Sequence, residues 1–459
     1  MLEYAVFFTD IALSAFYAAI LYVIIIRRMY PHLSPNDRKI AFYGWLLRVI
    51  GGVSIYHFYR LYYGGGDVIN FISDSLSLYS SLFHAPGTTI EYFFHSVIYH
   101  DFVDFHLKRP EFAYLWYSYR IGITYMNDPA TATVPVLYMP FVILSMGFIH
   151  PSIVLFATLS FLVFFRFYQS LKNIYPEAGY YLAFPFIFSP SVITWISLPF
   201  KEAVVLIMLL YTLEKLIFYP KSVWGYIAGI PTFYLTSIIK PYVIMSITPS
   251  IALSYVTRYV DKAKRNVVYY TFYWFFLVVG LIVSAYGIIY VSESQSKYSL
   301  DNILNYAQVV QYDLTRNEVY YGETGGSRYD IGEFSPTLLG VLQKFPIAFF
   351  TGAFRPLLWE SWKFVIFISS LEGTIFLIYI LLRMTKYGLL KLFIKIFNSP
   401  FGWPFIIYSI TFLFMTGLTS GNFGNLVRYR MPGLIFFYTI IIGTYEAMAA
   451  EARHHRSRQ

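Results

Sequence analysis

Long apolar runs, separated by short segments rich in Lys and Arg, set the pattern of this chain of 459 residues. Several runs reach the roughly 17–25 residues that a helix needs to cross the hydrocarbon core of a bilayer. The runs are continuous rather than alternating, which argues against a transmembrane β-barrel. The pattern therefore predicts an all-α, polytopic transmembrane bundle of about eleven spans. The predicted spans are 4–26, 40–62, 150–168, 180–197, 202–219, 223–239, 241–257, 267–290, 363–382, 402–418 and 431–448.

The first apolar run lacks the basic n-region and small-residue cleavage site of a secretory signal, so we interpret it as the first transmembrane helix. The apolar segment 134–148 is too short to cross the bilayer, and it predicts a partial or re-entrant helix that leads into 150–168. No internal repeat and no break in composition divides the chain. The sequence thus favours a single integral membrane domain over residues 1–459.

Basic residues indicate which ends of the spans face the cytoplasm. Of the 34 Lys and Arg residues, 19 lie in five loops and the C-terminal tail, at 27–39, 166–177, 214–222, 258–266, 383–398 and 449–459. The positive-inside rule assigns these segments to the cytoplasm. With an odd number of spans, the N-terminus is predicted outside and the C-terminus inside.

Two long polar segments, 63–133 and 291–362, are then predicted on the non-cytoplasmic face. The first contains two partly apolar stretches, around 76–83 and 90–105, which are expected to lie as amphipathic helices along the interface. The second contains the glycine-rich stretch Tyr321–Ser327, a loop that could order over a substrate.

Composition agrees with the membrane assignment and removes several classes of protein. Hydrophobic residues make up 57% of the chain and charged residues only 13%. A net charge of +9 can indicate nucleic-acid binding, but here the charge follows the loops of a membrane protein, and no nucleic-acid partner is predicted. There are no cysteines, which excludes thiol catalysis and disulfides. Walker loops, nucleophile elbows and dinucleotide-binding fingerprints are also missing from the sequence.

The turn Tyr62-Tyr63-Gly64-Gly65-Gly66-Asp67 opens the first outer loop directly after a predicted span. Three glycines allow backbone dihedrals closed to other residues and a close approach to a ligand. Asp67 is therefore a candidate acid or base at the edge of the bilayer, and its alternative role is to cap a helix that begins at Val68. Asp74 falls on nearly the same face two turns later, where it could orient Asp67, bind a divalent cation with it, or serve only as a structural residue.

Six basic residues break the positive-inside pattern, because they lie at or near the outward ends of spans. They are Lys201, Lys240, Arg355, Lys363, Arg428 and Arg430. Ionisable groups at membrane depth are costly and usually have a partner or a function. One alternative is snorkelling, or pairing with Glu202 and Glu360. For the set as a whole we favour binding of an anionic substrate, with a phosphate or pyrophosphate on a lipid carrier as the natural candidate.

Other polar residues give weaker signals. The first outer loop holds His95, His100, Asp101, Asp104 and His106, but their spacing matches no zinc signature, and no metal site is predicted there. Ionisable residues also fall in or near spans, where they either pair with one another or line a substrate cavity: Asp10, Arg48, His57, Arg60 and Glu372.

Four fragments, in order along most of the membrane region, resemble bacterial GT-C-type glycosyltransferases and the related O-antigen-polymerase-like proteins. They are Gly65-Gly66-Asp67; Ser189-Pro190-Ser191 through Trp195 to Lys201-Glu202; Phe354-Arg355-Pro356 with Trp359-Glu360; and Asn422-Phe423-Gly424 with Arg428-Tyr429-Arg430.

The resemblance implies an enzyme of the bacterial inner membrane that takes a sugar or oligosaccharide from a polyprenyl-phosphate or polyprenyl-diphosphate donor. Transfer to a hydroxyl of a glycan, lipid or protein acceptor would occur on the non-cytoplasmic face, in cell-surface glycan assembly. In GT-C enzymes the first outer loop supplies an acidic catalytic residue, and Asp67 is at the matching position. The donor-binding set expected here is Lys201, Lys240, Arg355, Arg428 and Arg430, supported by Glu202, Glu360 and Trp195.

One departure from the family pattern keeps two enzyme classes open. The acidic residue usually follows the first transmembrane helix, whereas Asp67 follows the second predicted span. Either a helix has been added at the N-terminus, or the chain resembles polymerases whose catalysis depends on arginines, which would give the main role to Arg355, Arg428 and Arg430. A transporter or flippase for lipid-linked saccharides is the non-enzymatic alternative, although no repeated halves or paired broken helices favour it.

Overall fold

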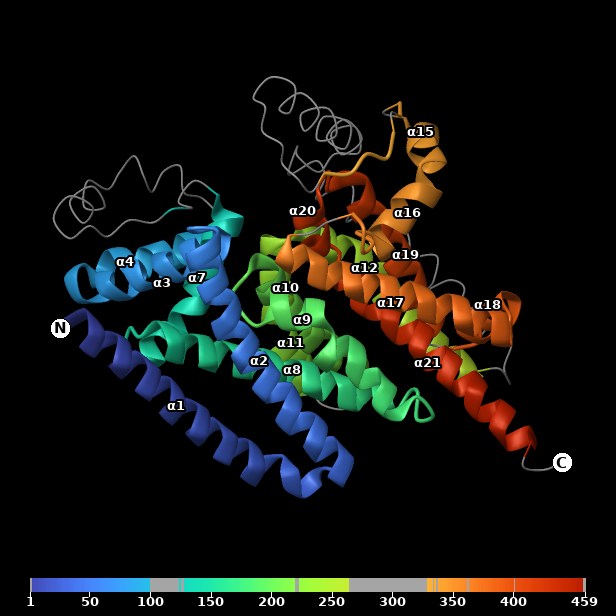
Figure 1. The fold of residues 1–459 in the computed structure, drawn as a ribbon, viewed down its shortest axis with the longest axis horizontal. Helices are drawn as coiled ribbons and strands as arrows, with labels where there is room; N and C mark the ends of the chain where they lie inside the picture. The colour runs from blue at the N-terminus through green and yellow to red at the C-terminus, as the bar shows by residue number, and fades with distance from the viewer. Residues whose placement is uncertain are drawn as a thin grey trace. The chain divides into compact units, whose positions relative to one another are not determined.

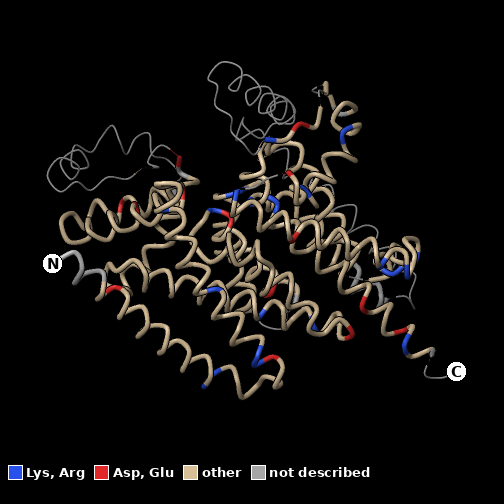
Figure 2. The backbone as a smooth tube through the Cα atoms, viewed as in Figure 1, with Lys and Arg blue, Asp and Glu red and all other residues tan. Residues whose placement is uncertain are grey.

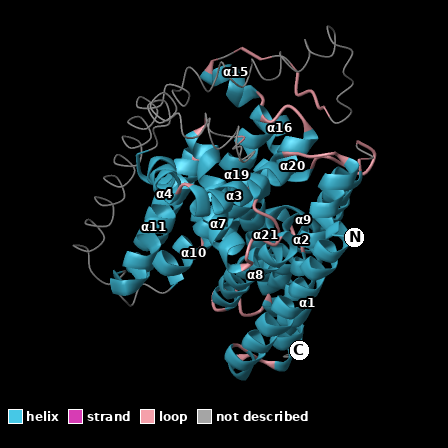
Figure 3. Ribbon diagram, turned by 90° about the vertical axis from the view of Figure 1, so that its left-hand side faces the viewer, coloured by secondary structure: helices cyan, strands magenta, loops and turns pink. Residues whose placement is uncertain are grey.

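The computed structural model describes most of the chain, namely residues 2–99, 124, 128–218, 223–263, 328–332, 334–335, 337–360, 363–399 and 401–456. Over these ranges the fold is helical with no strand, and a single isolated bridge joins Arg328 to Asn422 (Figures 1 and 3). The all-α class is therefore confirmed. The predicted span 267–290, the residues His100 to His106 and the loop Tyr321–Ser327 lie outside the described residues.

Six helical segments of the described chain are long and apolar enough to cross a membrane, which indicates a membrane protein. Each overlaps a span predicted from the sequence, but the count of about eleven spans is not confirmed. The six are Phe8–His32, Ile149–Lys172, Gly179–Ile196, Phe364–Tyr387, Gly402–Thr419 and Met431–His455.

Among the other predicted spans that the structure describes, the helices are shorter or more polar. Helix α2 (Pro35–Tyr62) is long, but it carries Asp37, Arg38, Lys39, Arg48 and Arg60 along its length. Helix α11 (Val223–Ile239) has 17 residues, and the apolar segment Pro241–Ser254 of α12 (Pro241–Ala263) is also shorter than 18 residues. These segments are therefore too short or too polar to be counted among the helices that could cross a bilayer.

The predicted span 180–197 is not one regular helix. It consists of a 3₁₀ turn at Gly179–Leu182, a π-helical turn at Phe184–Phe188 and the short helix α9 (Pro190–Ile196). Pro185 and Pro190 interrupt the pattern because proline has no backbone N–H and its ring disturbs a preceding helical turn. The break exposes backbone and hydroxyl groups of Ser189 and Ser191 to other partners.

The described chain divides into two compact units. The first comprises Met1–Phe167, Val192–Thr212 and Ile227–Lys240. In it, α3 (Asp67–His84) packs against α4 (Pro86–Phe94) and α7 (Pro129–Leu144). Helix α2 is joined to α8 (Ile149–Lys172) by two buried hydrogen bonds, from Trp45 Nε1 to Thr158 Oγ1 (3.0 Å) and from Arg48 Nη1 to Ser160 Oγ (3.2 Å).

The first unit also contains α1 (Leu2–Arg28), which meets α2 at a turn marked by basic residues, and α10 (Lys201–Leu213). These charges and those near the C-terminal end of α21 can be followed in Figure 2. Only 11% of the apolar window of α1 is buried, compared with 78% for α8. Helix α1 therefore presents most of its apolar surface outward, as expected of a helix that faces lipid.

The second unit comprises Tyr168–Ser191, Leu213–Tyr226 and Pro241–Gln459. Helix α19 (Gly402–Thr419) packs against α12, α16 (Phe345–Phe354) and α21 (Met431–Arg456). Gly352 of α16 and Gly417 of α19 permit this packing, because a Cβ on either would lie about 2 Å from a carbonyl oxygen of the other helix. The unit is completed by α15 (Leu338–Gln343), α17 (Phe364–Tyr387), α18 (Leu389–Phe397) and α20 (Phe423–Tyr429).

Candidate functional site

The glycine turn predicted from the sequence is a sharp connection between α2 and α3. Gly64, Gly65 and Gly66 have φ values of +69°, +155° and +130°, which a residue with a side chain adopts rarely. Gly66 holds the N-cap position, so Asp67 does not cap α3 but begins it. An acidic residue in the first turn is stabilised by the helix dipole. The Asp67 side chain is exposed, as an acceptor arriving from water would require.

Asp74 lies on the same helix but in a different environment, since it is only 1% exposed. Its carboxylate accepts hydrogen bonds from the backbone N–H of Thr124, at 2.9 and 3.0 Å, and from the Thr124 hydroxyl at 2.9 Å. These bonds give Asp74 a structural role, because they tie α3 to Thr124. Among the described residues, no three His, Asp or Glu side chains lie close enough together to hold a metal ion.

The predicted basic residues of the first unit both have polar partners. Lys240 Nζ contacts Glu202 Oε1 at 2.6 Å, and the two side chains are only 6% and 4% exposed. Lys201 Nζ donates to Thr131 Oγ1 at 2.8 Å and lies 3.7 Å from the carboxylate of Asp128. The pairing of Lys240 with Glu202, which the sequence leaves as an alternative, is therefore present.

Trp195 is 2% exposed and packs edge-on against Phe200, with ring centroids 5.5 Å apart. Its neighbourhood is hydrophobic, and Leu198 and Phe200 are also fully buried. Trp195 thus contributes to the packing that precedes α10, where Lys201 and Glu202 begin a new helix.

In the second unit, Arg355 follows α16 and pairs with Glu360. Nε and Nη2 of Arg355 each lie 2.6 Å from Glu360 Oε1, while Glu360 Oε2 accepts from the backbone N–H of Leu357 at 2.7 Å. The two side chains are 19% and 16% exposed. Glu360 therefore both neutralises Arg355 and closes the turn that connects α16 to α17.

Two aromatic rings flank Arg355. The carbon of its guanidinium lies 5.5 Å from the ring centroid of Tyr329 and 5.3 Å from that of Phe423. The rings themselves stack at 5.1 Å. The Tyr329 hydroxyl donates to the carbonyl of Gly417 at 2.9 Å, and burial raises the pKa of Tyr329, so the phenol stays protonated. Cation–π attraction is favourable in such a partly dehydrated setting.

Arg430 is completely buried where α20 ends and α21 begins. Its Nη1 donates to the backbone carbonyls of Arg355 and, at 3.4 Å, Gly352. Nε and Nη2 have no hydrogen-bond partner within the described residues. Burial lowers the pKa of Arg430, while the nearby Tyr438, Glu372 and Tyr329 act in the opposite direction. Burying a guanidinium with two nitrogen atoms that lack hydrogen-bond partners costs free energy, and an anion bound to those nitrogens would offset that cost.

Glu372 of α17 holds the broken segment before α9. Its carboxylate accepts from the Ser189 hydroxyl at 2.8 Å and from the Ser191 backbone N–H at 2.7 Å. The Ser191 hydroxyl lies 3.2 Å from that of Ser369. Glu372, one of the intramembrane ionisable residues of the sequence, is thus tied to the Ser189-Pro190-Ser191 fragment.

Arg428 lies on α20, two residues before Arg430, and is partly exposed. Its Nη2 donates to Asn425 Oδ1 at 3.1 Å, and its guanidinium lies 5.6 Å from the Tyr429 ring. Asn422 caps this helix by accepting from the Asn425 N–H at 2.8 Å. The structure therefore gathers Arg355, Arg428 and Arg430 around one short helix.

One polar chain of the first unit is not evident from the sequence, because His150 begins an apolar run. The His150 ring contacts Asp10 Oδ2 at 2.5 Å through Nδ1 and His57 Nε2 at 2.8 Å through Nε2. The backbone N–H of His150 also donates to Asp10 at 3.1 Å. These bonds join α1, α2 and α8, and they show that Asp10 and His57 are structural partners.

Comparisons of the chain with protein-family models, curated proteins and solved structures gave no match. The resemblance to GT-C-type enzymes therefore depends on the four short fragments of the sequence.

Proposed function

We propose that this protein is a membrane-embedded glycosyltransferase that uses a polyprenyl-phosphate or polyprenyl-diphosphate sugar donor. The observation that carries the proposal is the buried Arg430, whose Nε and Nη2 are without hydrogen-bond partners among the described residues. Arg355 contacts Arg430 through its carbonyl, and Arg428 lies on the same short helix. This arrangement supports a phosphate-binding role for the arginines.

The chemistry of a phosphate ester fits these groups. Guanidinium N–H groups donate in pairs to phosphate oxygens, and such charge-assisted bonds are strongest where water is excluded. As the anomeric C–O bond breaks, negative charge grows on the departing phosphate. Donors held rigidly by backbone contacts, as Arg430 is held by the carbonyls of Gly352 and Arg355, stabilise that charge without reorganisation.

In the proposed reaction an acceptor hydroxyl attacks the anomeric carbon and inverts its configuration. A base takes the proton of that hydroxyl, the role for which Asp67 is the candidate from the sequence, and the polyprenyl phosphate or diphosphate leaves with the electron pair of the broken bond. The exposed position of Asp67 at the glycine turn suits a base that meets an acceptor from the aqueous side. Asp74, buried and bonded to Thr124, is assigned no part in this step.

A repeat-unit polymerase that depends on arginines is the second candidate. The contact between Arg355 and Arg430, together with the aromatic rings that flank Arg355, favours it, because an arginine site of this kind needs no carboxylate base. Asp67 and the arginines belong to different units of the structure. The test therefore uses one variant for the base role of Asp67 and another for donor binding by the arginines.

The test uses the full chain in lipid nanodiscs, incubated with lipid-linked saccharides extracted from the source cells. Mass spectrometry measures both the released polyprenyl phosphate and the glycan product. For a base, Asp67→Asn lowers turnover about 10²–10⁴-fold and leaves donor binding unchanged. Arg428→Gln instead weakens donor binding about tenfold or more. Glu177→Gln and Arg27→Gln, on exposed side chains elsewhere, serve as matched controls.

The outcome for each variant decides between the readings. Near-normal turnover of Asp67→Asn with loss in Arg428→Gln would move the assignment to the arginine-dependent polymerase. Movement of donor across a proteoliposome membrane without any release of polyprenyl phosphate would replace the enzyme with a flippase.

A further inference from the structure

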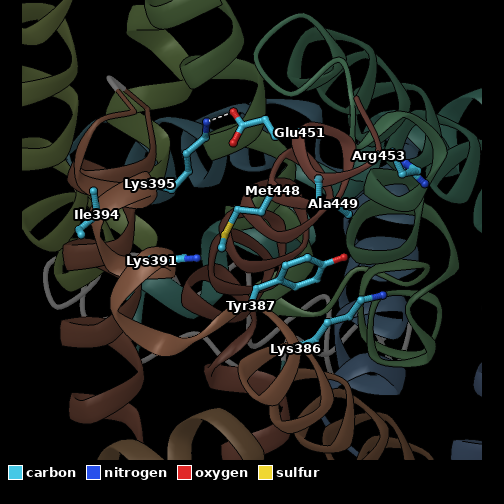
Figure 4. A pocket seen from close by; sticks show the side chains of 10 residues that line it. Lys386, Tyr387, Lys391, Ile394, Lys395, Met448, Ala449, Glu451 and Arg453 are labelled. Carbon is cyan, nitrogen blue, oxygen red and sulfur yellow. Dashed lines mark hydrogen bonds and ion pairs between the residues drawn. The ribbon is translucent and has the colours of Figure 1, made fainter. Parts of the chain in front are cut away.

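A cavity of about 560 Å³ lies where the C-terminal ends of α17 and α21 meet the short helix α18 (Figure 4). Lys386 and Tyr387 come from α17, Lys391 and Lys395 from α18, and Arg453 from α21. All belong to the second unit. The volume falls within the range of about 300–1,000 Å³ that is usual for small-molecule sites.

The cavity is strongly cationic. Four basic side chains and one carboxylate, Glu451, line it, which gives a formal charge of +3 (four minus one). Lys395 contacts Glu451 directly, and the Lys386 ammonium lies 5.4 Å from the Tyr387 ring. Lys391 and Arg453 have no ion-pair partner within the described part of the chain. Repulsion among these cations favours a bound anion.

Helix α18 has three distinct faces, as helical spacing requires. Leu392 and Ile396 are buried against the rest of the unit. Lys391 and Lys395 share the next face and line the cavity. The third face is apolar and exposed, with Leu390 73%, Phe393 43%, Ile394 53% and Phe397 56% accessible.

This combination is typical of a helix that lies in the membrane interface, with apolar side chains among acyl chains and lysines at headgroup level. Leu381 and Leu382, near the end of α17, are likewise exposed, at 51% and 64%. The sequence predicts that the segments 383–398 and 449–459 face the cytoplasm. Anionic lipids enriched in a cytoplasmic leaflet attract basic groups, and basic pockets between transmembrane helices bind their headgroups.

We infer that this cavity binds the phosphate headgroup of an anionic phospholipid of the surrounding bilayer. Lys391, Lys395 and Arg453 contact the headgroup, and its acyl chains lie along the exposed face of α18 beside Ile394. The site is separate from the arginines around α20 and does not depend on the proposed function.

The test is titration of the full chain in detergent with dioleoylphosphatidylglycerol, read by native mass spectrometry, with dioleoylphosphatidylcholine as the neutral lipid. Wild-type protein is expected to bind the anionic lipid more tightly. The double variant K391Q/R453Q should weaken that binding about 25-fold, because each basic residue near an anionic headgroup contributes a factor of about five. Its binding of phosphatidylcholine and its melting temperature should stay unchanged, since both side chains are exposed.

The matched control is R27Q/R28Q, which removes two exposed charges from the end of α1. It should change phosphatidylglycerol binding less than about twofold, because the local charges and not the net charge make the site. Equal losses in both double variants would overturn the inference, as would equal wild-type affinity for the two lipids. Inorganic phosphate that competes as well as the intact lipid would also overturn it, since acyl-chain contacts would then contribute nothing.

Discussion

Two buried cations, Lys240 in the first unit and Arg430 in the second, come from the set of basic residues that the sequence predicts at outward helix ends, but they have different surroundings. Lys240 reaches Glu202 at 2.6 Å, and both side chains are nearly inaccessible. Arg430 is held by two carbonyls through Nη1, while Nε and Nη2 find no partner among the described residues. A buried ion pair that is satisfied in this way is a structural feature, whereas a buried guanidinium with unused donors carries a free-energy cost that a bound anion would relieve.

The comparison assigns the sequence-predicted phosphate-binding residues to two roles. Lys240 serves the fold, because its charge is neutralised where it lies. Arg430, with Arg355 and Arg428 nearby, is the better candidate for binding an anion. The polar partners of each charged side chain therefore distinguish a structural residue from a candidate ligand-binding residue, although the sequence predicts the same role for both.

The largest effect is expected from Glu202→Gln, which leaves Lys240 buried without its counter-charge. Breaking a buried ion pair on one side costs about 3–5 kcal/mol in the free energy of unfolding. The measurement is reversible denaturation in mixed micelles. The double variant Glu202→Gln with Lys240→Met should recover much of the loss, because it removes the buried charge that the single variant leaves without a counter-charge. Equal losses in the single and double variants would show that the pair is not what stabilises this region.

A smaller loss of stability is expected from Arg430→Met, about 1–3 kcal/mol, because it leaves the carbonyls of Gly352 and Arg355 unsatisfied but also removes a buried charge. Binding of undecaprenyl phosphate should weaken about 10- to 100-fold, as expected for loss of a charged hydrogen bond. Microscale thermophoresis of the nanodisc-embedded chain measures the affinity. Arg430→Lys, which keeps the charge but loses the fork, should fall between wild type and Arg430→Met. Unchanged affinity in Arg430→Met would place this arginine with Lys240 as a structural residue.

The smallest effect is expected from Glu360→Gln, because Arg355 and Glu360 are partly exposed and the amide can still accept from Leu357. We expect a loss of about 1 kcal/mol in the free energy of unfolding. The same denaturation assay applies, with Glu177→Gln as the exposed control. A loss as large as that of Glu202→Gln would mean that solvent does not screen this pair, and the distinction between the two regions would fail.

Much of the fold follows from hydrophobic pattern alone. The runs around Ile149–Lys172, Phe364–Tyr387 and Met431–His455 are long, apolar and nearly free of charge, so their helices could be predicted. The break within 180–197 was missed, because apolar content does not reveal where Pro185 and Pro190 divide a span into short turns. Charges along α2 and the shortness of α11 explain why the count of about eleven spans is not confirmed.

In the candidate site, too, some features could be predicted from local sequence and others depend on contacts between distant residues. The turn at Gly64–Gly66 could be predicted from local sequence, because all three glycines have positive φ, whereas the catalytic role of Asp67 stays a prediction. The polar contacts of His150 could not be predicted, because an apolar run follows it in the sequence. Its partners Asp10 and His57 are 140 and 93 residues away.

By itself, the sequence determined the all-α class and the positions of the six long apolar helices, and it drew attention to basic residues near predicted helix ends. Those properties depend on composition and short-range periodicity, which the chain carries locally. Only the tertiary structure decided which charges are neutralised, because Lys240 and Glu202, or Arg430 and Gly352, meet across long separations in the chain. The free energy of a buried charge depends on the atoms within a few ångströms of it, and those neighbours exist only after the helices have packed.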